Sequence, residues 1–357
     1  FRREEYCVES GIFICKKGRG TSMKKLINRP ENFVKETMEG IIYAYGDKVK
    51  LLDGDERILL TNYPVEKGKV GIVTAGGSGH LPVFLGYVGQ GMLDGCAVGN
   101  VFASPSAKKM ADMIKACDYG SGVLCLYGNY GGDNMNFDMA CEMVEMDDVE
   151  TMTVRVKDDV ASSPKETMEK RRGVAGMVYA FKAAGAAAER MMSLEEVAGV
   201  AQKALDNIRT MGVALSPCIV PQVGEPTFQI EDDEIEIGMG IHGEKGIEVR
   251  KMMTADEVAE TLVGRITEDM PLAEGDEVSV LVNGLGATPM EEQLIVYRRV
   301  HELLNDMGVK VVMPHVGEYA TSMEMAGLSV TIFKLDEQLK ELLLSPAKTP
   351  FYTNLNK

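Results

Sequence analysis

Short apolar runs alternate along the chain with longer stretches in which apolar positions recur at a helical period. The apolar runs predict buried strands. In the first half, strands are predicted over residues 69–75, 123–127 and 152–156, and helices over 104–116 and 134–146. Ser104 and Pro105 suit the start of the first helix, as N-cap and first helical residue. Strands that alternate with helices in this way predict a mostly parallel α/β architecture.

A long helical region separates this half from a second strand-rich half. It covers residues 165–211 and contains a capping sequence at Ser193, followed by acidic residues. Beyond it, strands are predicted over 213–220, 234–239, 277–282, 309–313 and 329–334, and helices over 254–266 and 290–307. We therefore predict two α/β domains with mostly parallel sheets and an active site in the cleft at the C-terminal ends of the strands.

The domain boundaries follow from these patterns. Residues 1–22 are basic, contain two cysteines and precede Met23, so we interpret them as an N-terminal extension, either non-native or disordered. The first α/β domain is expected over residues 23–208 and the second over 209–336. We expect the polar C-terminal segment, residues 337–357, to pack back on the first domain.

Composition narrows the possible functions. The chain has 357 residues, of which 45% are hydrophobic and 26% charged, which is typical of a globular protein. A formal net charge of -16 disfavours binding to nucleic acid or to anionic membranes. No apolar run approaches the ~18 residues that a membrane helix needs. Seven scattered cysteines without a CxxC pair favour reduced thiols and a cytoplasmic location.

Two of the four histidines lie in glycine-rich loops after predicted strands. His80 follows Gly77-Ser78-Gly79, where glycines let the backbone approach a ligand closely. The alternative is a tight turn with a capping histidine. His242 lies between Gly240 and Gly243, an open setting that a structural histidine rarely needs, and we interpret it as a ring that a reacting partner must reach. His301 is predicted to be solvated, and His315 to follow a strand, where it could line a cleft.

Asp133 follows two glycines after the predicted strand 123–127. Its position suits a helix cap, a metal ligand or a general base, and the pattern alone favours the cap. The sequence has no His, Cys and Asp cluster at metal-ligand spacing, so no metal site is predicted. It also lacks a P-loop and the five-residue pattern of a hydrolase nucleophile elbow.

Seven ordered motifs between Met23 and the C-terminus closely resemble the substrate-binding (K) subunit of dihydroxyacetone kinases. They are GGSGHLP (76–82), GYVGQGML (86–93), NYGGDNMNF (129–137), RRGVAG (171–176), GIHGEKG (240–246), LVNGLGATP (281–289) and GEYATSMEMAG (317–327). The resemblance implies that the ketone carbon of a short ketose bonds to His242 as a hemiaminal. It implies that His80 and Asp133 act beside the reacting hydroxyl, with either one as the base, and that Gly77, Ser78 and Gly79 bind substrate hydroxyls.

The resemblance also implies partners. In the family a separate L subunit carries the nucleotide, so we expect no cofactor on this chain and ADP or ATP with Mg²⁺ on that partner. Some systems recharge the nucleotide through a phosphotransferase-system subunit and others by ATP exchange, and the sequence leaves this choice open. A homodimer is expected from the family.

Two positions depart from the family pattern. Leu81 stands where the family often has Glu, and Gly128 where it often has Lys. Loss of a lysine removes a charged donor and frees volume, so we hypothesise that the pocket accepts a ketose longer than dihydroxyacetone, such as erythrulose. Two other readings stay open: a non-catalytic paralogue that senses ketose and signals to a regulator, and an α/β scaffold without a ligand. A sensor needs no base, so the presence of both His80 and Asp133 favours the enzyme.

Overall fold

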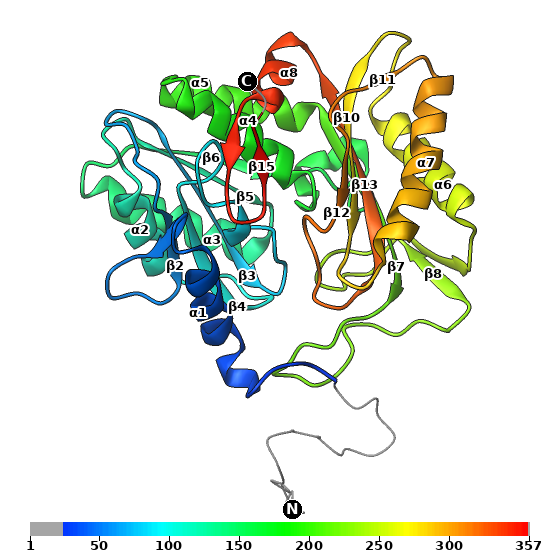
Figure 1. Ribbon diagram of the computed structural model, residues 1–357, viewed down its shortest axis with the longest axis horizontal. Helices are drawn as coiled ribbons and strands as arrows, with labels where there is room; N and C mark the ends of the chain where they lie inside the picture. The colour runs from blue at the N-terminus through cyan, green and yellow to red at the C-terminus, as the bar shows by residue number, and fades with distance from the viewer. Residues whose placement is uncertain (1–23, 356–357) are drawn as a thin grey trace, which may run out of the picture.

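The computed structural model describes residues 24–355, which form two α/β units lying side by side, each built on its own β-sheet (Figure 1). The α/β class predicted from the alternating pattern is confirmed. The predicted N-terminal extension, residues 1–22, lies outside the described residues. Within the described part, no helix combines the length and the apolar character needed to cross a bilayer.

The first sheet is formed by β1 (Val49–Leu51), β2 (Ile58–Thr61), β3 (Gly71–Ser78), β4 (Gly95–Val101), β5 (Val123–Gly128) and β6 (Thr151–Val156). Its order is β1-β2-β4-β3-β5-β6. The four neighbouring strands β4, β3, β5 and β6 run parallel, whereas β1 and β2 add an antiparallel edge. β5 is buried along its whole length, as expected for a central parallel strand with a continuous apolar sequence.

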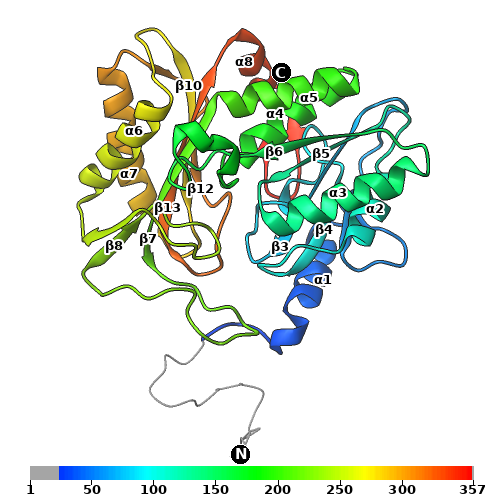
Figure 2. The ribbon, with the colours of Figure 1, turned by 180° about the vertical axis from the view of Figure 1, so that it is seen from behind.

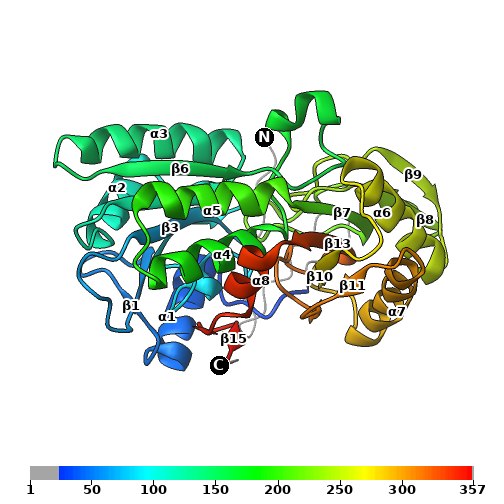
Figure 3. The same cartoon turned by 90° about the horizontal axis from the view of Figure 1, so that it is seen from above.

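Helices cover both faces of this sheet (Figure 2, Figure 3). They are α1 (Phe33–Tyr45), α2 (Ala107–Ala116), α3 (Gly131–Glu145), α4 (Met177–Glu189) and α5 (Leu194–Asp206), with 3-10 turns at Pro30–Asn32 (η1), Leu85–Tyr87 (η2) and Lys165–Lys170 (η3). α2 and α3 pack on one face, and α1, α4 and α5 on the other. The predicted cap of α5 is confirmed, because Ser193 and Glu196 form a reciprocal capping box.

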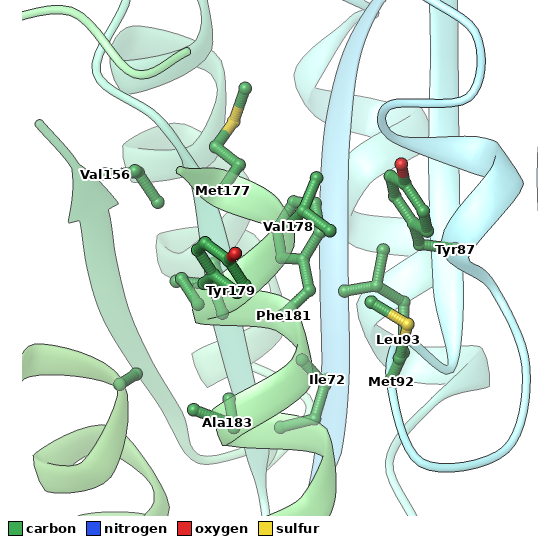
Figure 4. Packing of buried hydrophobic residues seen from close by; sticks show 14 of the residues in the cluster. Ile72, Tyr87, Met92, Leu93, Val156, Met177, Val178, Tyr179, Phe181 and Ala183 are labelled. Carbon is green, nitrogen blue, oxygen red and sulfur yellow. The ribbon is translucent and has the colours of Figure 1, made fainter. Parts of the chain in front are cut away.

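α4 connects the two units. Every residue of this helix except Glu189 is buried. Figure 4 shows its apolar side chains packed against the first unit, including Ile72 of β3. On the other side Tyr179 reaches the second sheet, where its ring lies 5.1 Å from that of Phe333 and its hydroxyl 2.7 Å from the Ser279 hydroxyl. An apolar helix between two sheets gives the units a shared core.

The second sheet is formed by β7 (Ile208–Ser216), β8 (Glu234–Ile237), β9 (Glu248–Lys251), β10 (Glu277–Gly284), β11 (Lys310–Val311), β12 (His315–Gly317) and β13 (Ala326–Leu335). Its order is β11-β10-β13-β7-β8-β9, and β12 also pairs with β10. The helices α6 (Ala255–Asp269) and α7 (Met290–Asp306) pack together on one face. The opposite face turns toward α4, since Leu281 and Phe333 belong to the same buried cluster as that helix.

The parallel arrangement predicted for both sheets is found in the first sheet from β4 to the edge strand β6, while the second sheet is mixed. β10 is parallel to β11 and β12, but β13 runs antiparallel to both β10 and β7, and β8 and β9 continue antiparallel. The cause lies in the connections. No helix separates β7 from β8 or β12 from β13. A parallel pair requires a long crossover, usually a helix, whereas a strand that returns by a loop alone pairs antiparallel.

The last part of the chain lies against the first unit. It contains α8 (Glu337–Leu344) and the short strands β14 (Ala347–Lys348) and β15 (Thr353–Asn354). The Thr349 hydroxyl donates a hydrogen bond to the Gly86 carbonyl, and the Phe351 ring lies 5.2 Å from that of Tyr45 in α1. Leu339, Leu342 and Leu343 of α8 belong to the buried cluster around α4.

Candidate functional site

The structure brings His80 and His242 together, although they belong to different units and 161 residues lie between them in the sequence. Their ring centroids lie 4.7 Å apart, with the rings nearly perpendicular. His80 follows β3 of the first sheet, and His242 lies in the loop after β8 of the second. Phe102 contacts both rings, with centroid distances of 4.7 Å to His80 and 5.3 Å to His242. The two glycine-rich loops therefore form one site between the units.

His80 is held in one tautomer. Its Nδ1 lies 2.8 Å from the Thr321 carbonyl, and because a carbonyl only accepts, Nδ1 must carry the proton. Nε2 is then the nitrogen with a lone pair, and among residues 24–355 this buried atom has no hydrogen-bond partner. Burial, together with the neighbouring His242, lowers the pKa of His80 to about 3. The ring is therefore neutral at physiological pH and is a weak base.

His242 is also held in one tautomer, by a residue that the sequence pattern did not single out. Glu244 Oε1 lies 2.9 Å from His242 Nδ1, and Glu244 Oε2 accepts the His242 backbone N–H at 2.9 Å. A carboxylate in this position takes the proton of Nδ1 as its hydrogen bond and leaves the lone pair on Nε2. Burial alone would raise the pKa of Glu244, but the hydrogen bond from His242 and favourable electrostatic interactions with His242 and Arg172 outweigh it and lower the pKa to about 2.

The two rings differ in access. The His242 side chain is 24% exposed, whereas His80 is only 1% exposed. Tyr130 packs edge-on against His242 with ring centroids 4.9 Å apart, so aromatic rings border it while part of it stays open. His242 is thus the ring that an incoming molecule can reach.

Asp133 lies in the first turn of α3, which begins at Gly131 rather than at the predicted residue 134. The N-cap position falls at Tyr130, so Asp133 does not cap the helix. Its Oδ1 is buried and has no hydrogen-bond partner among residues 24–355. Burial raises the pKa of Asp133 to about 6, against the opposing effects of a hydrogen bond with Ser104 and of the His242 charge. A carboxylate whose pKa lies near neutral pH, and which has an oxygen without a hydrogen-bond partner, is suited to accept a proton.

Ser104 was predicted to cap the helix over residues 104–116, and this prediction is wrong. α2 begins at Ala107 with Ser106 in the N-cap position. The Ser104 side chain instead lies beside the first turn of α3, where it lowers the pKa of Asp133. The Ser-Pro pair suited a helix start by local pattern, but the tertiary contact with α3 determines its place.

Gly77, Ser78 and Gly79 form the end of β3 and the turn into His80. The Ser78 carbonyl accepts from the Phe102 amide and the Gly79 carbonyl from the Met323 amide, so this turn is tied to both units. A Cβ on Gly77 would lie 2.7 Å from the Ala103 backbone nitrogen. Gly79 adopts φ +103°, a conformation that side chains disfavour.

The Gly77→Ala substitution is therefore expected to lower the free energy of unfolding by about 2 kcal/mol or more, because backbone has to move. Gly199→Ala is the matched control, since Gly199 is exposed in α5 and a Cβ there meets nothing within 4 Å. Helix propensity predicts that the control is stabilised by about 0.5–1 kcal/mol. Denaturant unfolding measures both, and an unchanged midpoint for Gly77→Ala would contradict this account of the turn.

The volume expected beside Gly128 is filled. A Cβ on Gly128 would lie 3.1 Å from the Tyr130 ring and 3.3 Å from the Met177 sulfur. The Tyr130 hydroxyl donates to the Gly173 carbonyl, which fixes the ring in this place. Leu81, the other departure from the family pattern, packs against the hydrophobic core of the first unit. The missing lysine therefore changes the charge of the site more than its size.

The other two histidines lie elsewhere. His315 is buried between the units, with Nδ1 3.3 Å from the Tyr179 hydroxyl and Nε2 3.2 Å from the Tyr352 hydroxyl. Burial lowers its pKa to about 4, so it is a neutral core residue and does not line the site. His301 lies exposed on α7, as predicted. Over the described residues, no group of three or more His, Cys, Asp or Glu side chains is arranged to hold a metal ion.

The fold and the site define a two-unit α/β protein in which loops of adjoining sheets pair two histidines near a buried carboxylate. This chain belongs to the Dak1 domain family, whose match spans residues 39–351, and within it to the substrate-binding subunits of dihydroxyacetone kinases. The resemblance noted from the motifs is confirmed.

Two relatives and two solved structures illustrate the similarity. The chain is 46% identical to the dihydroxyacetone-binding subunit DhaK of PTS-dependent dihydroxyacetone kinase 1 of Listeria innocua, covering 92% of this chain and 99% of the relative. It is 42% identical to the L-erythrulose kinase of Pectobacterium atrosepticum, covering 92% of this chain and 56% of that protein. The dihydroxyacetone kinase of C. freundii superposes with a TM-score of 0.85 at 30% identity, covering 93% of this chain and 60% of that one. The dihydroxyacetone kinase operon co-activator Dha-DhaQ superposes with a TM-score of 0.83 at 31% identity, covering 90% and 98%.

Proposed function

We propose that this chain is the ketose-binding subunit of a dihydroxyacetone-type kinase and holds its substrate as a hemiaminal on His242. The hydrogen bond between His242 Nδ1 and Glu244 is the observation that carries this proposal. It leaves the lone pair on Nε2 of a ring that solvent can reach, and such a neutral imidazole nitrogen can add to a ketone carbon. The new C–N bond forms as the carbonyl π electrons move to oxygen. The oxygen takes up a proton from solvent, and the ring, now substituted on Nε2, gives up its Nδ1 proton through Glu244, so the hemiaminal is neutral.

Covalent capture explains how a small polyol can be selected. A three-carbon ketone with two hydroxyls has about six heavy atoms, so non-covalent binding has a ceiling near ~9 kcal/mol and polar ligands reach far less in water. A reversible C–N bond supplies the binding free energy that the hydroxyl contacts of so small a ligand cannot. It also excludes glycerol, which offers the same hydroxyls but no carbonyl. The backbone at Gly77, Ser78 and Gly79 lies beside His80, where it would bind the substrate hydroxyls.

Phosphoryl transfer then needs a base and a donor. We assign the base to Asp133, whose free oxygen and raised pKa suit it better than His80, whose lowered pKa makes it a poor proton acceptor. His80 Nε2 would accept a hydrogen bond from the bound ketose. The phosphoryl group would come from a nucleotide-bearing L subunit, with ADP or ATP and Mg²⁺ on that partner and, in a phosphotransferase-system arrangement, a further donor subunit. A cytoplasmic homodimer is part of this proposal, on the basis of the family.

The test is a transfer assay with the purified chain, an L-type partner and its nucleotide. The chain alone is expected to bind ketose and transfer nothing, and the complete set to produce ketose phosphate. Dihydroxyacetone and erythrulose are both candidate substrates, since relatives are named for each. We expect erythrulose to be accepted at least as well, because Gly128 stands where the family often has lysine, so the pocket lacks that charged donor. A clear preference for the three-carbon ketone would overturn that expectation, and glycerol is the negative control.

A co-activator that senses ketose is the second candidate, and the likeness to Dha-DhaQ favours it. A sensor would capture ketose on His242 in the same way but would have no use for a proton acceptor. The free oxygen of Asp133 and its contact with Ser104 favour the kinase subunit. Adduct formation without any transfer in the complete assay would decide for the sensor.

A further inference from the structure

Arg172 of the first unit reaches across to the loop of the second unit that carries His242. It lies between η3 and α4, and its side chain is only 14% exposed. Its Nη1 lies 3.8 Å from Glu244 Oε2, and its Nη2 donates to the Gly238 carbonyl at 3.2 Å. The guanidinium therefore contacts the start of the His242 loop and the carboxylate that orients the His242 ring.

Arg172 is itself held firmly within the first unit. Nε and Nη2 both donate to Asp159 Oδ2, at 3.0 and 2.7 Å, and Asp159 is 3% exposed. The Arg172 backbone N–H donates to the Ser162 hydroxyl at 3.0 Å, and its carbonyl accepts from the Asp159 amide. A buried guanidinium fixed at several points presents its remaining N–H groups in one direction, because the group is planar and rigid.

The second unit leaves room for this contact at Gly240. A Cβ there would lie 2.2 Å from Glu244 Oε2 and 2.4 Å from Arg172 Nη1. Carboxylate and guanidinium thus meet directly over the glycine, two residues before His242. The glycines beside His242 therefore leave space for the Arg172 and Glu244 side chains as well as for a substrate.

We infer that Arg172, anchored by Asp159, is a positioning residue that fixes Glu244 and through it the orientation and tautomer of His242. The inference rests on the proposed capture of ketose by His242. To that proposal it adds the residue that, through Glu244, keeps the proton on Nδ1 and so makes Nε2 the reactive nitrogen. Arg172 makes no hydrogen bond to either histidine ring; it reaches His242 through Glu244 and, at the start of the loop, through the Gly238 carbonyl. The nucleophile and Glu244 belong to one unit and the residue that fixes Glu244 belongs to the other, so the docking of the two units favours the reactive tautomer of His242.

The first test measures the tautomer of His242 without any ketose, by nitrogen NMR of protein labelled at the imidazole nitrogens. The wild-type ring is expected to carry its proton on Nδ1 alone. Arg172→Gln is expected to give a mixture of the two neutral tautomers, and Arg172→Lys, which keeps a charge, to restore much of the Nδ1–H form. An unchanged tautomer in Arg172→Gln would overturn the inference, whether or not the chain captures ketose.

The second test measures ketose capture and turnover with the L-type partner. Arg172→Gln is expected to raise KM for ketose by about tenfold or more, as when a partner orienting a metal-binding histidine is removed, with kcat at saturating ketose changed much less. The effect should be much smaller in a Glu244→Gln background, since Arg172 acts mainly through that carboxylate. Equal effects in both backgrounds would show that Arg172 acts by another route and would overturn the inference.

Two further variants separate positioning from stability. Arg172→Gln leaves the buried Asp159 charge unpaired, so the double variant Arg172→Gln with Asp159→Asn removes both charges and keeps the test valid if the single variant unfolds. Arg171→Lys is the control, because neighbouring Arg171 is buried even more completely, at 1% against 14% exposed for Arg172, and pairs with Asp269, away from Glu244. The control is expected to lose stability and keep its ketose affinity. If the control raised KM as much as Arg172→Gln, the effect would be one of stability and the inference would be wrong.

Discussion

The His242→Ala variant is expected to lose the ketose adduct completely and to lose at least about a hundredfold in kcat/KM, because a ligand of about six heavy atoms binds weakly without its covalent bond. No other histidine can substitute. His80 is only 1% exposed and its pKa is lowered to about 3, which makes Nε2 a weaker nucleophile, and His315 lies in the core between Tyr179 and Tyr352. The fold should survive, since His242 lies in a partly exposed loop and contributes little to either hydrophobic core.

Carbon NMR with dihydroxyacetone labelled at the ketone carbon measures this loss directly. The wild-type protein is expected to convert part of the ketone signal into that of a saturated carbon bearing nitrogen and oxygen. His301→Ala is the control, because that side chain is exposed on α7 and far from the site in the fold. An adduct of normal occupancy in His242→Ala would show that another group captures the ketose.

The Asp133→Asn variant is expected to keep the adduct and to lose about 10²- to 10⁴-fold in the rate of phosphoryl transfer, the usual worth of a general base. Asparagine has the same shape and can keep a hydrogen bond with Ser104, but it cannot accept the substrate proton. In the wild type, transfer should rise with pH through about 6, the raised pKa of Asp133, and level off above it, because only the ionised carboxylate is a base. Rate measurements across this range test the assignment, and normal turnover by Asp133→Asn would contradict it.

The same substitution should stabilise the folded protein. Folding raises the pKa of Asp133 from 3.8 to about 6, so the charged form is penalised in the native state by up to about 3 kcal/mol. For a carboxyl with a raised pKa, this penalty is present in full above the folded pKa and disappears as pH falls toward the unfolded value. Asp133→Asn is therefore expected to unfold at higher denaturant concentration at pH 8, with a gain that shrinks below pH 6. Improved stability with lost activity is the signature of a site residue and not of a structural one.

The sequence predicted the residues that carry an unusual local pattern. His80, His242 and Asp133 each follow a strand and stand beside glycines, and these features are visible without neighbours in space. Glu244 could have been predicted in the same way, because it lies two residues after His242 in the motif GIHGEKG (240–246). Tyr130 and Arg172 also stand beside glycines, within two of the motifs quoted above, but their roles, like that of Phe102, depend on contacts between segments that only the fold brings together.

The fold shows the same division. Long apolar runs such as β5 and periodic segments such as α7 were predicted close to their observed bounds. The short strands β1, β2 and β4 and the helix α1 were not predicted, because charged or glycine residues interrupt their patterns. Strand direction in the second sheet could not be derived from periodicity either, because the pattern of apolar residues in β13 is compatible with both parallel and antiparallel pairing. Tertiary connections decide it.

A crystal of this chain soaked with dihydroxyacetone shows whether His242 captures the ketone carbon. Continuous density is expected from Nε2 of His242 to that carbon, with Glu244 still bonded to Nδ1, His80 Nε2 within hydrogen-bond distance of the ketose and a terminal hydroxyl beside Asp133. Ketose bound without a bond to His242, or bonded through Nδ1 after displacement of Glu244, would contradict this expectation.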